Sequence, residues 1–284
     1  MKKTFLSLLI ASFATSAFAQ GHLTGDIMLN GNFFQRDAAL KTPENQLYNN
    51  LLSGGEGWLS FRYNYKGFSA FLRVDAFNNS NLYQPNRAIN GYGIGAYSLT
   101  KEFNNLKVTG GYIYDQIGSG VLFRAYEDRG LLIDNALVGL HLSYKASDHL
   151  NIKAFTGQQK DVVNFNRYQP IIKGLDIEGD FSIGDNVHFV PGVGVLNRTM
   201  DQTSIDAIVS RINSQPLDTR FIPQYNTYGF TAYNMLTAGD FSWYVEGAYK
   251  THEAIDVNDK LIDRDGNVQY TTLGYAKKGI AVNL

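Results

Sequence analysis

The chain has 284 residues, of which 44% are apolar, 13% aromatic and only 18% charged, and its 25 lysines and arginines nearly balance its 26 aspartates and glutamates. This balance gives no basic surface for nucleic acid, and the absence of cysteine excludes disulfides, cysteine-ligated metal centres and a thiol nucleophile. A soluble domain usually carries about 25% charged residues. The composition therefore leaves a membrane protein open and excludes a basic nucleic-acid-binding protein.

The first 19 residues have the pattern of a secretory signal peptide. Lys2 and Lys3 precede a short apolar run, and Ala17-Phe18-Ala19 supplies the small-x-small site at which such peptides are cleaved. The run is too short to cross about 30 Å of hydrocarbon, and no run of about 18 uncharged apolar residues follows it. We therefore expect a signal peptide over residues 1–19 and a mature chain over residues 20–284 that crosses a membrane only as strands.

In the mature chain, apolar residues recur at every second position in segment after segment. Leu59, Phe61 and Tyr63, for example, alternate with Ser60 and Arg62. Successive side chains of a strand point to opposite faces, so each such segment has one apolar and one polar face. The same alternation occupies residues 23–30, 68–76, 106–115, 175–183 and 241–250.

The length and the connections of these segments favour a transmembrane barrel over a soluble secreted β-sandwich, which shows the same alternation. Segments of 9–11 residues suit tilted transmembrane strands, whereas an average globular strand has about 5–6. Short and long connections alternate through twelve strands, as in outer-membrane barrels with tight periplasmic turns and long surface loops. The short connections are at 66–67, 101–105, 145–149, 184–186, 239–240 and 277–279, and the long ones at 37–57, 78–92, 116–134, 159–171, 199–224 and 251–269.

After these twelve strands, residues 280–284 resemble the opening half of a thirteenth. Single-chain bacterial barrels close with an even number of strands, and the preceding turn at Lys277-Lys278-Gly279 fits the periplasmic series. We therefore predict an all-β fold, an antiparallel transmembrane outer-membrane β-barrel with a polar lumen. We also predict that the 284 residues form the N-terminal part of a barrel of 14 or more strands.

Two local features depart from the strand pattern. Pro191 lies in an otherwise regular strand, where it removes one ladder hydrogen bond and predicts a bulge or a local gap in pairing. In residues 204–212, Ile205, Ile208, Val209 and Ile212 follow the i, i+3, i+4, i+7 spacing of a helix. We expect a short helix there, inside the longest connection.

The densest unusual stretch follows a strong strand and contains Arg124, Tyr126, Glu127, Asp128 and Arg129. One interpretation is an ion-pair network that pins a loop at the barrel rim or inside the lumen. The other is a constriction or a ligand-gripping patch, because arginines bind carboxylates, phosphates or sugar hydroxyls. The glycines just before it lack the spacing of a phosphate-binding loop. These five residues are therefore our candidates for lumen or rim binding or for a constriction.

This stretch also carries a resemblance. Residues 112–139, with the core GSGVLFRAYEDRGLLIDNALVG, resemble an uncharacterised family of outer-membrane β-barrels from Bacteroidota, and residues 58–77 and 91–103 support the likeness. The resemblance is strongest over about residues 58–180. It implies a barrel in the outer membrane of a Gram-negative bacterium and brings no catalytic or binding residues with it.

An enzyme is the first alternative. His141 and Ser143 share one strand face, and Asn151 lies across the next tight turn, which is similar to the His-x-Ser pair and asparagine of outer-membrane phospholipases. In those enzymes the site faces lipid, whereas the alternation here turns His141 and Ser143 inward. A serine nucleophile also needs an oriented base and an oxyanion site, and the sequence shows neither.

Metal and paired-acid sites have weaker support. The five histidines are scattered with no pair at ligand spacing, and the acid-rich connection near the C-terminus lacks the calcium-loop spacing. Asp176, Glu178 and Asp180 share a strand face and suit either glycoside hydrolysis or a polar lumen wall, with Arg198 or Lys250 as partners. The polar wall is the simpler account, and we expect no metal and no cofactor.

The sequence therefore predicts function only in outline. We expect an outer-membrane protein without enzymatic activity that contacts outer-membrane lipid. It acts as a pore for small solutes, or as a barrel subunit of an assembly with other envelope proteins, and nucleic acid is not a partner. The alternatives are a phospholipase-like hydrolase and a soluble secreted β-sandwich.

Overall fold

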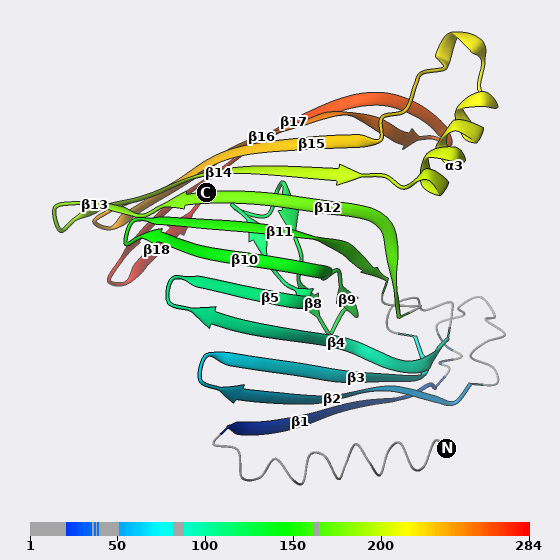
Figure 1. The fold of residues 1–284 in the computed structure, drawn as a ribbon, viewed down its shortest axis with the longest axis horizontal. Coiled ribbons are helices and arrows are strands. Elements are labelled where there is room, and N and C mark those ends of the chain that lie inside the picture. The colour runs from blue at the N-terminus through cyan, green and yellow to red at the C-terminus, as the bar shows by residue number, and fades with distance from the viewer. Residues whose placement is uncertain (1–20, 36, 38, 40–50, 82–87, 162–164) are drawn as a thin grey trace.

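The computed structural model of the chain describes residues 21–35, 37, 39, 51–81, 88–161 and 165–284 (Figure 1). The signal peptide expected over residues 1–19 lies outside the described residues, and so do parts of three of the predicted long connections.

Twelve full strands and a short thirteenth follow one another in a single antiparallel sheet, as the alternation predicts. They are β1 (His22–Phe33), β2 (Ser53–Tyr65), β3 (Phe68–Ser80), β4 (Ile89–Phe103), β5 (Leu106–Ile113), β10 (Leu137–Ser147), β11 (Leu150–Asp161), β12 (Asn166–Gly179), β14 (Val187–Thr199), β15 (Asn226–Ala238), β16 (Phe241–Val257), β17 (Lys260–Lys277) and β18 (Ile280–Asn283). A further short strand, β13 (Phe181–Ile183), pairs with β14 beside this path, so the sheet holds 14 strands.

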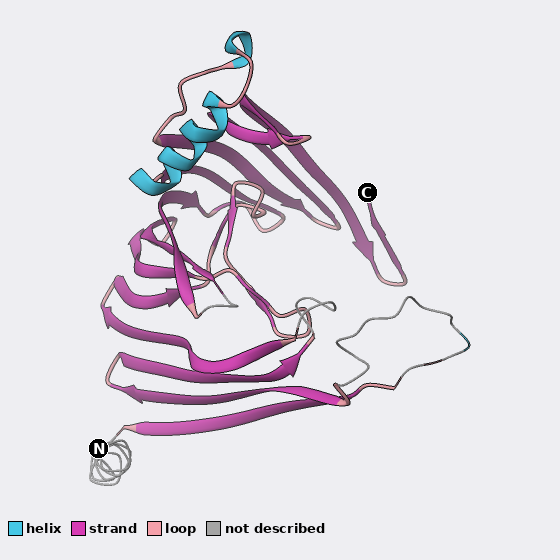
Figure 2. Ribbon diagram, turned by 90° about the vertical axis from the view of Figure 1, so that its right-hand side faces the viewer, coloured by secondary structure: helices cyan, strands magenta, loops and turns pink. Residues whose placement is uncertain are grey.

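The sheet is strongly curved, with β1 at one edge and β18 at the other (Figure 2). Among the described residues, β1 pairs with β2 and β18 with β17, so the sheet is an open barrel wall. The soluble β-sandwich is therefore wrong, because a sandwich packs two large sheets face to face and the other described sheets have two strands each. The number of strands in a closed barrel stays a prediction.

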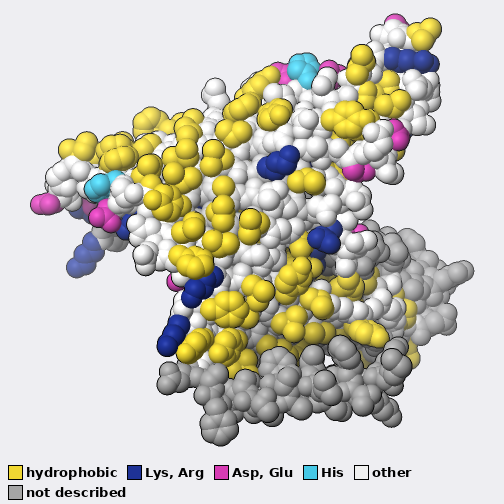
Figure 3. Space-filling model, in the orientation of Figure 1, with side chains coloured by type: hydrophobic (Ala, Val, Ile, Leu, Met, Phe, Trp, Pro, Cys, Tyr) yellow, Lys and Arg dark blue, Asp and Glu magenta, His cyan; other side chains and the backbone are white. Residues whose placement is uncertain are grey.

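The two faces of the sheet have the polarity of a membrane barrel. On β2, Trp58 and Ser60 of the concave face are 3% and 0% exposed, whereas Leu59 and Phe61 of the convex face are 39% and 38% exposed. Hydrophobic side chains cover much of the convex face (Figure 3). Exposing apolar surface to water costs about 25 cal/mol per Å². Lipid contact removes that cost, which accounts for an apolar exterior around a polar interior.

Pro191, in β14, leaves the local gap in pairing that its missing N–H predicts. β12 pairs with β14 as far as Glu178 opposite Gly192, and β13 resumes the same register with Phe181 opposite Phe189. The break between β12 and β13 falls opposite Pro191. On its other side β14 pairs with β15 in an unbroken register.

One predicted surface loop is wrong, because much of it is sheet. Residues 251–269 were expected as a long connection, but β16 continues to Val257 and β17 begins at Lys260. Asn258 and Asp259 have φ of 52° and 64°, which suits the two central residues of a tight hairpin turn. Polar residues stand on both faces of this extension, which hides the alternation from the sequence.

The predicted helix is confirmed as α3 (Gln202–Asn213) at the long-loop end of the sheet (Figure 1). Asp201 caps its N-terminus, and hydrogen bonds from the hydroxyl and the backbone amide of Ser204 lower the pKa of the Asp201 carboxyl. Ile205 and Ile212 are buried. A 3₁₀ turn, η3 (Leu217–Thr219), follows. No helix in the described part of the chain has the length and apolarity to cross a membrane.

Candidate functional site

The connection between β5 and β10 folds into the concave side of the sheet (Figure 2). We call residues 114–136 the inward segment. It contains two small hairpins, β6 (Gln116–Ile117) with β7 (Phe123–Arg124) and β8 (Glu127–Asp128) with β9 (Ile133–Asp134). The segment therefore lies where a pore would have its lumen.

An apolar cluster fixes one side of the inward segment to the wall. Ile117 and Phe123 are 0% and 9% exposed and pack with Leu137 and Phe155 of the wall. The rings of Phe123 and Phe155 have centroids 4.7 Å apart. Burying side chains of this size contributes about 1.5–3 kcal/mol each, so the segment is a packed part of the fold.

A buried ion network centred on Arg73 fixes the second hairpin. Arg73 on β3 is 2% exposed and donates from Nε to Asp75 Oδ1 at 2.6 Å and from Nη2 to Asp134 Oδ2 at 3.1 Å. It also pairs with Glu127, which accepts from Arg129 Nε at 3.2 Å. Two residues of the wall and three of the inward segment thus share one network. Buried charges are tolerated when several partners satisfy them in this way.

The same network reaches a second wall strand through Asp134. Lys160 on β11 is 3% exposed and donates to Asp134 Oδ2 at 2.5 Å and to the Gly95 carbonyl at 2.6 Å. The Tyr114 hydroxyl donates to Asp134 Oδ1 at 2.9 Å. Burial and the nearby charges of Asp134 and Glu127 raise the pKa of the Tyr114 phenol. Tyr114 therefore stays a neutral hydrogen-bond donor.

Glu246 on β16 holds the tip of the inward segment across the lumen. Its carboxylate is 1% exposed and accepts from the Ser119 amide at 2.9 Å, from the Ser119 hydroxyl, and from Thr231 Oγ1 at 2.8 Å and Tyr244 Oη at 2.7 Å. Gly118 has φ of 54°, and a Cβ there would lie 2.9 Å from Glu246 Oε1. The glycine is needed for this close approach.

A third set of charges joins the inward segment to β10, β11 and β12. Asp115 contacts His141 Nε2 at 2.8 Å and Lys153 Nζ at 3.2 Å, and Lys153 lies 3.1 Å from Asp176 Oδ2. Burial raises the pKa of the Asp115 carboxyl, but the hydrogen bond with His141 and the charge of Lys153 outweigh burial and lower it. The Tyr233 hydroxyl donates to Asp176 at 2.9 Å. These side chains form a continuous polar wall.

The partners predicted for Asp176 are wrong. Arg198 and Lys250 both pair with Glu253, whereas Asp176 forms an ion pair with Lys153 on the neighbouring strand. Asp180 lies at the tight-turn end, 2.6 Å from His188 Nε2. The acids of this strand face therefore have separate surroundings, and the polar-wall interpretation accounts for them.

The five candidate residues of the sequence all lie in the inward segment but serve different purposes. Glu127 and Arg129 belong to the ion network, and Arg129 also lies 5.9 Å from the Trp58 ring centroid. Asp128 accepts from the Leu131 amide at 3.1 Å and shapes the turn. Arg124 and Tyr126 stack on each other outside the network, with the guanidinium carbon 4.4 Å from the ring centroid.

Sequence reasoning missed Arg73, Lys160 and Glu246, the wall residues that hold the inward segment. Arg73 and Glu246 stand on the polar face of alternating strands, where a charge is also expected simply to meet water. The available sign of a charge network in the sequence was an arginine and an aspartate on the same strand face, at positions 73 and 75. Their partners came from elsewhere in the chain.

The phospholipase-like arrangement does not form in the described residues. His141 faces inward as expected, but its Nε2 contacts Asp115 and its ring stacks 6.3 Å from Phe155. Ser143 lies opposite Lys153 on β11, and Asn151, two positions from Lys153, lies opposite Lys145. His141 therefore has a structural partner rather than a serine to activate.

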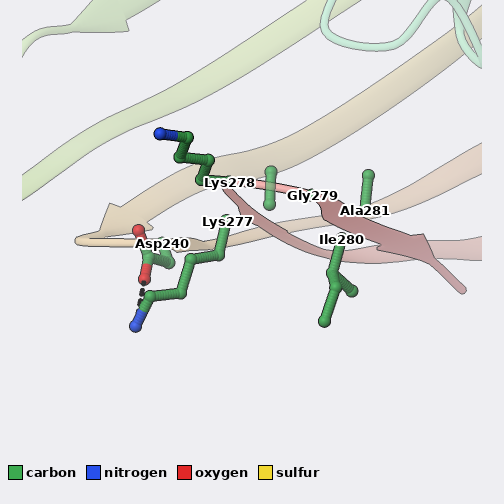
Figure 4. A pocket seen from close by; sticks show the side chains of 7 residues that line it. Asp240, Lys277, Lys278, Gly279, Ile280 and Ala281 are labelled. Atoms are coloured by element: carbon green, nitrogen blue, oxygen red, sulfur yellow. Dashed lines mark ion pairs between the residues drawn. The ribbon is translucent and has the colours of Figure 1, made fainter.

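Two other possible sites, a metal site and a surface hollow, offer few groups for binding or catalysis. The described part of the chain has no group of three His, Asp or Glu side chains arranged to hold a metal ion. A shallow hollow at the tight-turn end is lined by Asp240 and residues 276–281 (Figure 4). Its one ion pair joins Lys277 Nζ to Asp240 Oδ2 at 3.8 Å, while Lys278 points to the other side. The inward segment remains the candidate functional site.

Comparison with known proteins gives a family match and a set of distant structural likenesses. The model of a family of unknown function (DUF6029) matches residues 1–284. No curated protein matches the chain.

The solved structures similar to this chain include three bacterial proteins. Acinetobacter baumannii OccAB3 is 10% identical with a TM-score of 0.43, covering 91% of this chain and 77% of that chain. Pseudomonas aeruginosa OpdK with vanillate is 10% identical with a TM-score of 0.43, covering 90% and 76%. Pseudomonas putida OprB is 9% identical with a TM-score of 0.47, covering 94% and 73%. Likenesses this distant assign no function to this chain.

Proposed function

We propose that this chain, which belongs to the family of unknown function DUF6029, forms the wall and the constriction of an outer-membrane pore for small solutes. One observation carries the proposal: the inward segment occupies the polar, concave side of the sheet and is fixed there at both ends. A segment held in this way narrows the lumen without filling it with apolar side chains.

The outer membrane suits the exterior of the sheet. Large apolar side chains are exposed along the convex face, as at Ile27 (65%), Leu99 (55%) and Trp243 (46%). Aromatic pairs such as Phe241 and Tyr275, with centroids 4.8 Å apart, lie beside the tight turns. Rings at strand ends match the boundary between hydrocarbon and headgroups. Outer-membrane lipid is therefore the partner we propose for this face.

The test is single-channel conductance of the purified full-length protein in planar bilayers. We expect the wild type to conduct. Replacing residues 116–134 by a short turn should increase the conductance about twofold or more, because the constriction is removed. The matched control shortens the outer connection over residues 202–220, which lies at the long-loop end and should leave the conductance nearly unchanged.

Folding is checked in the same preparations by heat-modifiable mobility on a gel. A folded wild type that does not conduct contradicts the pore and favours the second role expected from the sequence, a barrel subunit of an envelope assembly. Equal conductance of the wild type and the segment-replaced variant would also contradict the proposed constriction. Because the replacement also removes the apolar cluster, Glu246→Ala serves as a milder variant that frees only the tip.

A further inference from the structure

Arg124 faces the open side of the lumen. β6 and β7 pair with Gln116 opposite Arg124 and Ile117 opposite Phe123. Ile117 and Phe123 are buried against the wall, so strand alternation directs Gln116 and Arg124 away from it. Arg124 is accordingly exposed, whereas Arg129 of the same segment is 26% exposed and pairs with a carboxylate.

Three features hold Arg124 in place. Its guanidinium lies over the Tyr126 ring at 4.4 Å. Gly120, with φ of 93°, brings the preceding turn against the arginine stem, since a Cβ there would lie 3.1 Å from Arg124 Cβ and Cδ. Asn135 donates to the Arg124 carbonyl at 3.1 Å and accepts from the Tyr126 amide at 2.6 Å. These contacts position the side chain without an ion pair to any residue that the structure describes.

No carboxylate of the described residues lies within ion-pair distance of Arg124, in contrast to Arg73, Arg129 and Arg198. The nearest acid along the adjoining strand, Asp115, is turned to the wall and engaged by His141 and Lys153. An arginine stacked on an aromatic ring keeps its N–H edge free for two oxygens of one anion.

We infer that Arg124, on its Tyr126 platform, is a binding site in the lumen for the oxyanion group of a small solute, a carboxylate or a phosphate. The inference rests on the proposed pore and names the class of solute that the constriction favours. Because the guanidinium binds oxyanions in a bidentate manner, a lysine in its place keeps the charge and loses the paired hydrogen bonds.

The experiment compares the wild type with Arg124→Gln and Arg124→Lys. In a potassium chloride gradient across a planar bilayer, Arg124→Gln should shift the reversal potential toward cation preference. Block of the current by sodium acetate or by inorganic phosphate should require about tenfold more anion in Arg124→Gln. Arg124→Lys should keep the reversal potential and lose part of the block. The two anions distinguish a carboxylate site from a phosphate site.

Two control variants test whether the effect is local. Lys173→Gln removes a cation from the convex face, where Lys173 contacts Asn197 and Thr199, and should change neither measurement. Glu178→Gln removes a lumen carboxylate that accepts a hydrogen bond from the Tyr233 hydroxyl, and should shift the reversal potential in the opposite direction.

A second readout is independent of conductance: line broadening of phosphate and acetate signals in nuclear magnetic resonance with detergent-solubilised protein. Broadening that disappears in Arg124→Gln supports the anion site even where the wild type does not conduct, so the pore would fail and the site would stand. Unchanged broadening and unchanged reversal potential in Arg124→Gln overturn the inference while leaving a conducting pore intact.

Discussion

The two longest connections between strands are the inward segment and the outer connection. They differ in whether the ion pairs that attach them are buried or exposed. The inward segment is held by Arg73 of the wall strand β3, which is 2% exposed and binds the carboxylates of Asp75, Glu127 and Asp134. In the outer connection, Arg211 on α3 is 50% exposed and pairs with Asp256 at 2.5 Å. A buried charge must keep its partners, whereas an exposed pair is weakened by water and salt.

This difference indicates how each excursion can contribute to function. The inward segment is fixed by interactions that are costly to break, so it can hold Arg124 at a constant place in the lumen. The outer connection is attached by an exposed ion pair and by the Gln215 side chain, which exchanges two hydrogen bonds with the Leu261 backbone. The exposed ion pair contributes little to this attachment, which also buries Ile205 and Ile212 of α3.

The largest effect is expected from breaking the inner network. Arg73→Met leaves three carboxylates without their shared cation, and removing one partner of a buried ion group costs about 3–5 kcal/mol. Urea unfolding in detergent, followed by tryptophan fluorescence, measures this loss. Arg62→Met is the matched control, because Arg62 is 51% exposed in its pair with Asp26 and should cost less than about 1 kcal/mol. Equal losses of unfolding free energy in the two variants would contradict the difference between buried and exposed ion pairs.

Glu246→Gln should have the next largest effect. The buried carboxylate accepts from Ser119, Thr231 and Tyr244, and weakening these charge-assisted hydrogen bonds costs about 1–3 kcal/mol. The released tip should appear as increased open-channel current noise and faster amide exchange near residue 119. Tyr244→Phe removes a single donor and should cost about 1 kcal/mol. Unchanged open-channel current noise in Glu246→Gln would show that the tip is held by other contacts.

Arg211→Gln should change little. An exposed ion pair contributes about 0–1 kcal/mol, and salt should abolish even this difference. Amide exchange of α3 at low and at high ionic strength measures it. An effect as large as that of Arg73→Met would mean that the outer connection is held as firmly as the inner one.

The smallest effect is a pH dependence at the cap of α3. The folded-state pKa of Asp201 is lowered, so its contribution is present above the unfolded carboxyl pKa and is lost as the pH falls through the folded one. The protection factors of the amides at the start of α3, which correct for the intrinsic pH dependence of exchange, should therefore fall on acidification. Asp201→Asn keeps a capping side chain and should remove the pH dependence.

The sheet could be predicted because its pattern is local. Alternation at Leu59 and Phe61 records which face meets lipid, and Pro191 and the apolar spacing of residues 204–212 act within a few positions of the chain. The hairpin extension around Asn258 was missed for the same reason. Polar residues stand on both of its faces, so no alternation records it.

The ion network could not be predicted because its partners are distant in the chain. Arg73 and Glu127 are 54 residues apart, and Ser119 and Glu246 are 127 apart. Strand register decided that Asp176 meets Lys153 instead of Arg198. The five candidate residues lie in one segment. Which of them anchor the segment, and which is left without a carboxylate partner among the described residues, depends on which side each strand of the segment turns to the wall.

The sequence by itself therefore determined the strands, their two faces, the short helix and the segment that concentrates charge, because each rests on periodicity or composition within one stretch of chain. Only the tertiary structure decided that residues 114–136 fold inward, that Arg73 and Glu246 hold them, and that Arg124 is left facing the lumen. The physical reason is that burial and pairing of charges depend on neighbours that the curvature and register of the sheet bring together.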